Sequence, residues 1–211
     1  MARIAVQLDW WRDPKGYRLV ETGRPKMQCV VRNGTGHGPE DFVLLRPLDS
    51  TDVLFRIFAN EATTPNGVLD FVRRFGSLTW AGWSATEGEP VPYAISDADH
   101  MRQVLRYWAT SRAQPDEPFV PQTGRPVSLD AMVVWDPIVK TLKWELRPKT
   151  LLDGLWLQLG QALTANVQIR QCERCGNFFE AGRGTGRRLD AKFCSDEHRV
   201  AFNSLKRSRE K

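Results

Sequence analysis

The sequence predicts an α+β protein, with a mixed body in residues 1–169 and a small cysteine-containing domain in residues 170–211. Apolar runs typical of both strands and helices follow one another without the regular alternation of a doubly wound parallel sheet. Three of the four cysteines and one of the three histidines lie within 27 residues near the C-terminus. A chain of 211 residues is long enough for one full core and a small appended domain.

The N-terminal part of the body is predicted to be rich in β-strands. Residues 4–8 and 17–20 are apolar runs that flank a turn sequence at residues 13–16, which predicts a β-hairpin. A further strand is expected at residues 28–31. The apolar run at residues 53–59 is compatible with either a strand or a helix.

Helices are expected in the middle of the body. Residues 64–75 carry an apolar stripe at helical spacing, with Thr64 as the N-terminal cap and Gly76 as the stop. A second helix is predicted to start at Ser96 and to end before the proline-rich loop at residues 114–126.

The body is expected to close with two strands and a helix. Residues 131–135 and 140–146 have strand character, and the second run alternates apolar and polar residues. Leucines and a tryptophan at helical spacing predict a helix from about residue 149 to residue 163.

The charge distribution points to an anionic partner of the C-terminal domain. The chain has 30 Lys and Arg against 25 Asp and Glu, and residues 170–211 contain 11 basic and 6 acidic residues. The body is therefore balanced, and the excess of positive charge is local. No apolar stretch is long enough to span a membrane, and no signal peptide is evident, so a cytoplasmic location without membrane contact is expected.

The spacing of the C-terminal cysteines and histidine is that of a metal site. Cys172 and Cys175 are separated by two residues, and Cys194 and His198 by three, in a C-x2-C-x18-C-x3-H pattern. Three thiolates and one imidazole form a closed tetrahedral donor set, which predicts one structural Zn²⁺ per chain. The alternative, ordinary reduced cysteines in a core, does not account for the clustering.

The order of these elements predicts a treble-clef zinc finger packed against the body. The expected parts are a knuckle at Cys172, a hairpin from about residue 178 to residue 193, and a helix entered at Cys194. Three phenylalanines would form a small core beside the ion: Phe178, Phe179 and Phe193.

In this motif the sequence resembles bacterial treble-clef fingers of the CGNR type. The resemblance covers residues 170–211, and the segment from residue 58 to residue 76 looks like the N-terminal domain found with such fingers. It implies the same four ligands, Cys172, Cys175, Cys194 and His198, and a DNA-binding role in transcription regulation. The chain departs from the family at the fourth ligand, where His198-Arg199 replaces a cysteine followed by Gly-Asn-Arg.

The finger offers basic residues on its helix and in one loop. A helical wheel places His198, Ala201, Phe202 and Leu205 on a face toward the zinc, with polar and basic residues opposite. The predicted nucleic-acid contacts are Arg183, Arg187, Arg188, Arg199, Asn203, Lys206 and Arg207. DNA is favoured over RNA, and no aromatic side chain is expected to be exposed for base stacking.

The sequence predicts a regulator with a finger that binds nucleic acid and a body that binds a small effector or a protein. A non-enzymatic adaptor that binds another protein through its finger and body is the alternative. An enzyme with its site in the body is a third hypothesis, although Cys29 and His37 are better explained as a buried thiol and a loop histidine. Nuclease chemistry is disfavoured because His198 is already assigned to the zinc.

Overall fold

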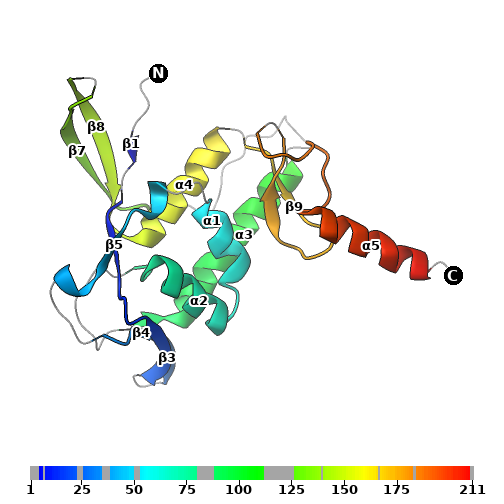
Figure 1. Cartoon of the computed structure of the whole chain (residues 1–211), viewed down its shortest axis with the longest axis horizontal. Helices are drawn as coiled ribbons and strands as arrows, with labels where there is room; N and C mark the ends of the chain where they lie inside the picture. Colours follow the sequence, from blue (N-terminus) through cyan, green and yellow to red (C-terminus); the bar gives the residue numbers. More distant parts are fainter. Residues whose placement is uncertain are drawn as a thin grey trace. The chain divides into compact units, whose positions relative to one another are not determined.

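The computed structural model confirms the α+β class and describes residues 5–6, 8–22, 26–34, 39–49, 53–79, 88–111, 126–138, 140–165, 167–182 and 184–209. Its helices, shown in Figure 1, are α1 (Leu54–Glu61), α2 (Pro65–Phe75), α3 (Val91–Ser111), α4 (Leu151–Thr164) and α5 (Asp196–Arg209). Its strands are β1 (Ala5–Val6), β2 (Trp10–Arg12), β3 (Tyr17–Thr22), β4 (Met27–Arg32), β5 (Val43–Leu45), β6 (Glu89–Pro90), β7 (Leu129–Asp136), β8 (Thr141–Pro148), β9 (Ile169–Gln171) and β10 (Phe178–Glu180).

The chain divides into two compact units. The first comprises residues 1–99 and 125–160, and the second comprises residues 100–124 and 161–211. The second unit thus contains the predicted finger together with the C-terminal parts of α3 and α4. A domain boundary after residue 169 stays a prediction.

The core of the first unit is built on α1 and α2. The apolar run at residues 53–59 is helical, and Phe58 packs edge-on against Phe71 with ring centroids 5.0 Å apart. The helix expected at residues 64–75 is confirmed as α2. The side chain of Thr64 accepts a hydrogen bond from the N–H of Gly67 at 3.1 Å, as an N-terminal cap does.

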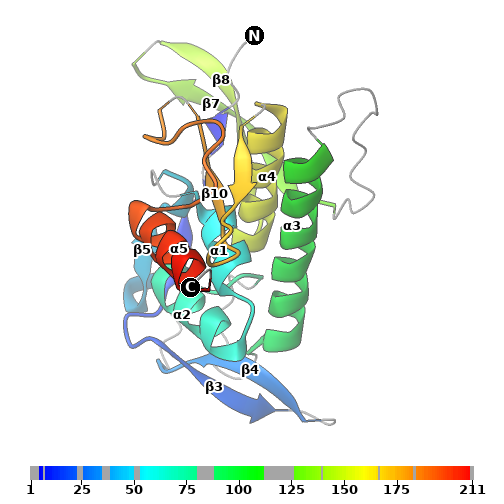
Figure 2. The same ribbon diagram turned by 90° about the vertical axis from the view of Figure 1, so that its right-hand side faces the viewer.

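The predicted N-terminal hairpin is wrong in its pairing. The turn at residues 13–16 is present, with Gly16 at φ +77°, but β3 pairs with β4 in an antiparallel ribbon (Figure 2). The residues before the turn form two separate strands: β1 pairs in parallel with β8, and β2 pairs with β5. Pairing with β8 joins positions 140 residues apart, and local turn chemistry carries no information about such a partner.

The strands expected at residues 131–135 and 140–146 are present as β7 and β8, and the two pair in antiparallel register. Aromatic side chains outside the finger are exposed: Trp135 of β7 and Trp144 of β8 are 59% and 61% exposed, and Tyr93 of α3 is 64% exposed. The chain therefore does present aromatic side chains to solvent. Alternation in a strand shows which residues share a face but not whether that face is covered.

The remaining helices begin or end away from the expected residues. Helix α3 starts at Val91, five residues before the predicted start at Ser96, and residues 112–125 lie outside the described part of the chain. Helix α4 starts at Leu151, where Thr150 caps it by accepting a hydrogen bond from the N–H of Asp153 at 3.0 Å.

Candidate metal centre

A short hairpin presents the first two cysteines. Strands β9 and β10 pair in antiparallel register, and the chain between them turns back through a knuckle closed by two backbone hydrogen bonds of 2.9 Å. The N–H of Gly176 donates to the carbonyl of Cys172, and the N–H of Cys172 donates to the carbonyl of Asn177. Gly176 has φ +73°, a conformation that glycine adopts without strain. The turn directs Cys172 and Cys175 to one side.

Helix α5 presents the other two side chains of the site. Ser195 caps this helix: its hydroxyl accepts a hydrogen bond from the N–H of His198 at 3.2 Å. Asp196 and Glu197 occupy the first turn, where negative charge stabilises the helix dipole. Cys194 just before the helix and His198 one turn into it consequently point the same way.

Cys172, Cys175, Cys194 and His198 converge on one point, and we call them the Cys3His cluster. Their ligand atoms all lie within 4.8 Å of one another. The Sγ atoms of Cys175 and Cys194 are 3.8 Å apart, and Nδ1 of His198 lies 3.7 Å from Sγ of Cys172 and 3.0 Å from Sγ of Cys194.

Two of these separations match the edges of a tetrahedral ion, the S–S distance of 3.8 Å and the S–N distance of 3.7 Å, whereas the 3.0 Å between Cys194 and His198 is shorter. With Zn–S bonds of about 2.3 Å and Zn–N bonds of about 2.0–2.1 Å, the edges of the tetrahedron are about 3.8 Å between sulfurs and about 3.6 Å between sulfur and nitrogen. The cysteines are free rather than joined in disulfides. The cluster can therefore hold a metal ion, with Nδ1 as the ligating atom of His198.

The electrostatics of the cluster favour a cation. Burial raises the pKa of Cys172, but hydrogen bonds from the backbone of Cys194, Cys175 and Arg174 and from His198 lower it to about 6. Burial and the neighbouring thiols Cys172 and Cys175 raise the pKa of Cys194 to about 12. The first thiolate therefore forms readily, and its negative charge opposes ionisation of the next thiol. A divalent cation bound between them would remove this repulsion.

A small apolar cluster supports one side of the site. Cys172, Phe179 and Ala181 are buried together, with Phe193 and Cys194 packed against them. Phe178 was expected in the same core, but it points to the other face of β10, as strand alternation requires. There the guanidinium of Arg102, from α3, lies 5.8 Å from its ring centroid.

Two parts of the predicted finger topology are corrected. A hairpin was expected from residue 178 to residue 193, but β10 pairs with β9, and the described residues of that segment form one isolated bridge, between Gly182 and Arg187. Leu205 was expected to face the zinc but is 48% exposed. Phe202 does pack against Phe193, with ring centroids 5.1 Å apart, and α5 continues for about two turns after that contact (Figure 1).

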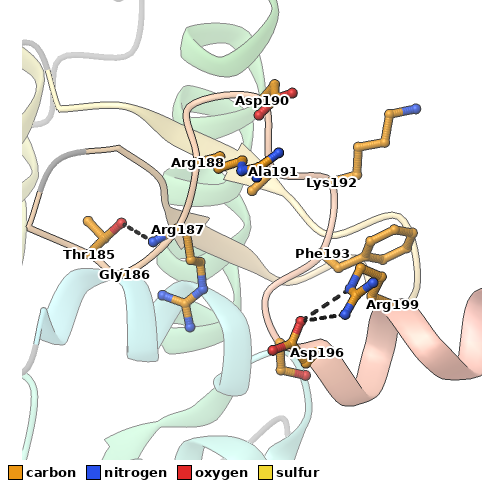
Figure 3. Close-up of a pocket in the computed structure, with 11 residues that line it drawn as sticks. Thr185, Gly186, Arg187, Arg188, Asp190, Ala191, Lys192, Phe193, Asp196 and Arg199 are labelled. Atoms are coloured by element: carbon orange, nitrogen blue, oxygen red, sulfur yellow. Dashed lines mark hydrogen bonds and ion pairs between the residues drawn. The ribbon is translucent and has the colours of Figure 1, made fainter.

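The predicted nucleic-acid residues fall into two described groups. Arg187, Arg188 and Arg199 border a groove of about 770 Å³ beside the Cys3His cluster, shown in Figure 3. Asn203, Lys206 and Arg207 are exposed further along α5. Arg183 lies outside the described residues, as does His37. Sequence reasoning missed Lys192, which also lines the groove and forms an ion pair with Glu173 at 3.3 Å.

Arg187 has a structural contact that its sequence context did not reveal. Its Nε donates a hydrogen bond to the carbonyl of Cys194 at 3.0 Å, and its guanidinium lies 5.8 Å from the centroid of Phe179. Arg199 is paired with Asp196 at 3.1 Å (Figure 3). Both arginines therefore support the local structure in addition to supplying charge.

Comparison with known proteins gives no match: no family model fits the chain, and neither the curated proteins nor the solved structures include one similar to it. The resemblance to CGNR-type fingers consequently stays a prediction from the sequence. Among the described residues, none of the helices combines the length and apolar character that crossing a bilayer requires.

Proposed function

We propose that the Cys3His cluster holds one structural Zn²⁺ and that the finger built around it binds nucleic acid, DNA in preference to RNA. Sulfur and imidazole donors favour zinc over the hard cations that prefer oxygen. Zinc would join the β9–β10 knuckle to the start of α5, two segments whose shared apolar core is small. Its role is thus to stabilise the finger.

The observation that carries the proposal is the basic groove beside the cluster. Its lining includes four basic residues, Arg187, Arg188, Lys192 and Arg199, against two acidic residues, Asp190 and Asp196. Gly186 lies in the turn that lines the groove (Figure 3), and space is open around its backbone, so a phosphate chain could come close there. Such a surface suits a polyanion.

Helix α5 extends this basic surface. Its 14 residues give a length of about 21 Å, and an α-helix of this kind fits the major groove of B-DNA. Asn203, Lys206 and Arg207 are exposed on it. Arginine and lysine can contact phosphates or guanine edges, and asparagine can contact adenine. We therefore propose a transcription regulator whose first unit binds a small effector or a protein partner.

The test is the salt dependence of binding to duplex DNA. Each phosphate contact contributes about −0.9 to the slope of log K against log salt concentration. Replacing both Lys206 and Arg207 by Ala should make this slope shallower by about two units without loss of metal, since neither side chain belongs to the cluster. The matched control is the double replacement of Lys15 and Lys26, two exposed lysines of the first unit, which should leave the slope unchanged.

The same titration separates the proposal from its alternative. If the zinc-loaded protein retains neither DNA nor RNA at low salt, the proposed nucleic-acid binding is wrong and the adaptor hypothesis takes its place. Equal weakening by the α5 and the control replacements would show that binding follows total charge, which contradicts a specific role for α5.

A further inference from the structure

Strands β7 and β8 carry a large apolar surface in the first unit. Val133 and Trp135 of β7 and Leu142 and Trp144 of β8 are 52%, 59%, 67% and 61% exposed. We call these four side chains the hairpin face. Side chains this large are seldom left in water together without a binding role.

The register of the hairpin places these residues on one side. Val133 lies directly opposite Trp144, and Trp135 lies directly opposite Leu142, in the antiparallel ribbon visible in Figure 2. Positions two apart along a strand point to the same side of the sheet. The four side chains thus form two adjacent cross-strand pairs and one continuous patch.

The area of the patch matches the apolar part of a protein interface. At these exposures the two tryptophans, Leu142 and Val133 offer on the order of 400–500 Å² of apolar surface. A standard interface buries about 800 Å² per partner, of which a little over half is apolar. The hairpin face alone can therefore supply the apolar centre of a stable interface.

The charges around the patch favour an identical partner. Residues 129–149 contain three acidic and four basic residues, so two copies would not repel each other strongly. Three of the basic groups are already paired with acidic side chains: Lys143 with Asp136 at 3.1 Å, Arg147 with Glu145 at 2.7 Å, and Lys149 with Asp130 at 3.3 Å. Little positive charge is left to attract a nucleic acid, and no strong charge of either sign is present to select an oppositely charged protein.

We propose that the hairpin face packs against the same face of a second copy of this chain. A two-fold axis between two stacked sheets brings like residues together, as in most homodimers. Sheets stacked about 10 Å apart would interleave the four tryptophans contributed by two copies. Edge-to-edge pairing through β7 would leave these side chains in water, so the patch favours stacking of faces. This inference does not depend on nucleic-acid binding by the finger.

The experiment is sedimentation velocity on the full, zinc-supplemented chain over a range of concentrations, without nucleic acid. The wild-type protein should form a dimer, and Trp135→Lys or Trp144→Lys should raise its dissociation constant by about 30-fold or more. Tyr93→Lys is the matched control, because Tyr93 is an aromatic residue of similar exposure that lies outside the hairpin. The dissociation constant of this variant's dimer should equal that of the wild-type protein. Circular dichroism and metal content of each variant check that the fold is retained.

Three results would overturn the proposal. The wild-type protein could remain a monomer at several hundred micromolar, or its dimer could be insensitive to both tryptophan replacements while folding is unchanged. In the third, the wild-type protein is a monomer that binds single-stranded nucleic acid, and both tryptophan variants bind it more weakly than the wild type does. That result would assign the hairpin face to base stacking instead. A dimer that survives complete loss of DNA binding by the finger supports the proposal.

Discussion

Arg187 donates a hydrogen bond from its Nε to the backbone carbonyl of Cys194, at a distance of 3.0 Å. This contact ties the basic loop to a residue of the Cys3His cluster. The neighbouring Arg188 lines the same groove without a corresponding contact among the interactions found in the described residues. The two arginines thus offer a way to separate structural support from charge.

Arg187→Ala should weaken both zinc retention and DNA binding, whereas Arg188→Ala should weaken only DNA binding. A hydrogen bond of this kind contributes about 1 kcal/mol, which corresponds to roughly a fivefold change in apparent zinc affinity. Competition with a chelator measures zinc retention. Identical zinc affinities in the two variants would show that the contact to Cys194 does not support the metal centre.

Phe202→Ala should destabilise the finger more than Leu205→Ala. The ring of Phe202 packs against that of Phe193, with centroids 5.1 Å apart and planes inclined at 50°, and Leu205 is about half exposed. We expect a loss of about 1–2 kcal/mol for Phe202→Ala and little change for Leu205→Ala. Thermal unfolding of the zinc-loaded protein is the measurement. A larger effect of Leu205→Ala would show that α5 packs along its whole length.

Glu89 is a buried carboxylate that accepts four hydrogen bonds from residues 77–79. It accepts hydrogen bonds of 2.6–3.1 Å from the hydroxyls of Ser77 and Thr79 and from the N–H groups of Leu78 and Thr79. Glu89→Ala leaves these donors buried without a partner and should cost about 3 kcal/mol or more in unfolding free energy.

Glu89→Gln is the matched control. Its amide oxygen can accept the three hydrogen bonds that Oε2 now accepts, and its NH₂ can donate to the hydroxyl of Thr79, so we expect a cost of about 1 kcal/mol. Urea denaturation compares the two variants. Equal losses would show that the negative charge, and not the hydrogen bonds, stabilises the loop.

Thr64→Ala should destabilise α2 by about 1 kcal/mol, because it removes the side-chain oxygen that accepts the hydrogen bond from Gly67. Thr63→Ala, one residue outside the cap, should have a smaller effect. The same urea titration applies. No difference between the two variants would contradict the role of Thr64 as the cap.

The features that the sequence predicts correctly are those encoded locally. The bounds of α2 follow from Thr64 and Gly76 at its ends. The common direction of Cys172 and Cys175, and that of Cys194 and His198, follows from the short spacing within each pair. The pairing of β1 with β8 depends on a segment 140 residues away, and no local pattern specifies it.

The spacing of apolar residues also could not predict which of the grouped side chains are exposed to solvent. The alternation at residues 140–146 correctly groups Leu142 with Trp144, but it does not show that their common side faces solvent. Similarly, helical periodicity places Leu205 with Phe202, whereas the apolar core of the finger is too short to cover both.

The metal content of the purified full chain tests the central claim most directly. We predict about one zinc per wild-type chain, and loss of that zinc and of the folded finger in Cys175→Ser. The control Cys29→Ser should keep its full zinc content, because Cys29 belongs to the first unit and is not part of the cluster. Protein produced with ample zinc that contains none, or a Cys175→Ser variant that keeps a full equivalent, would contradict it.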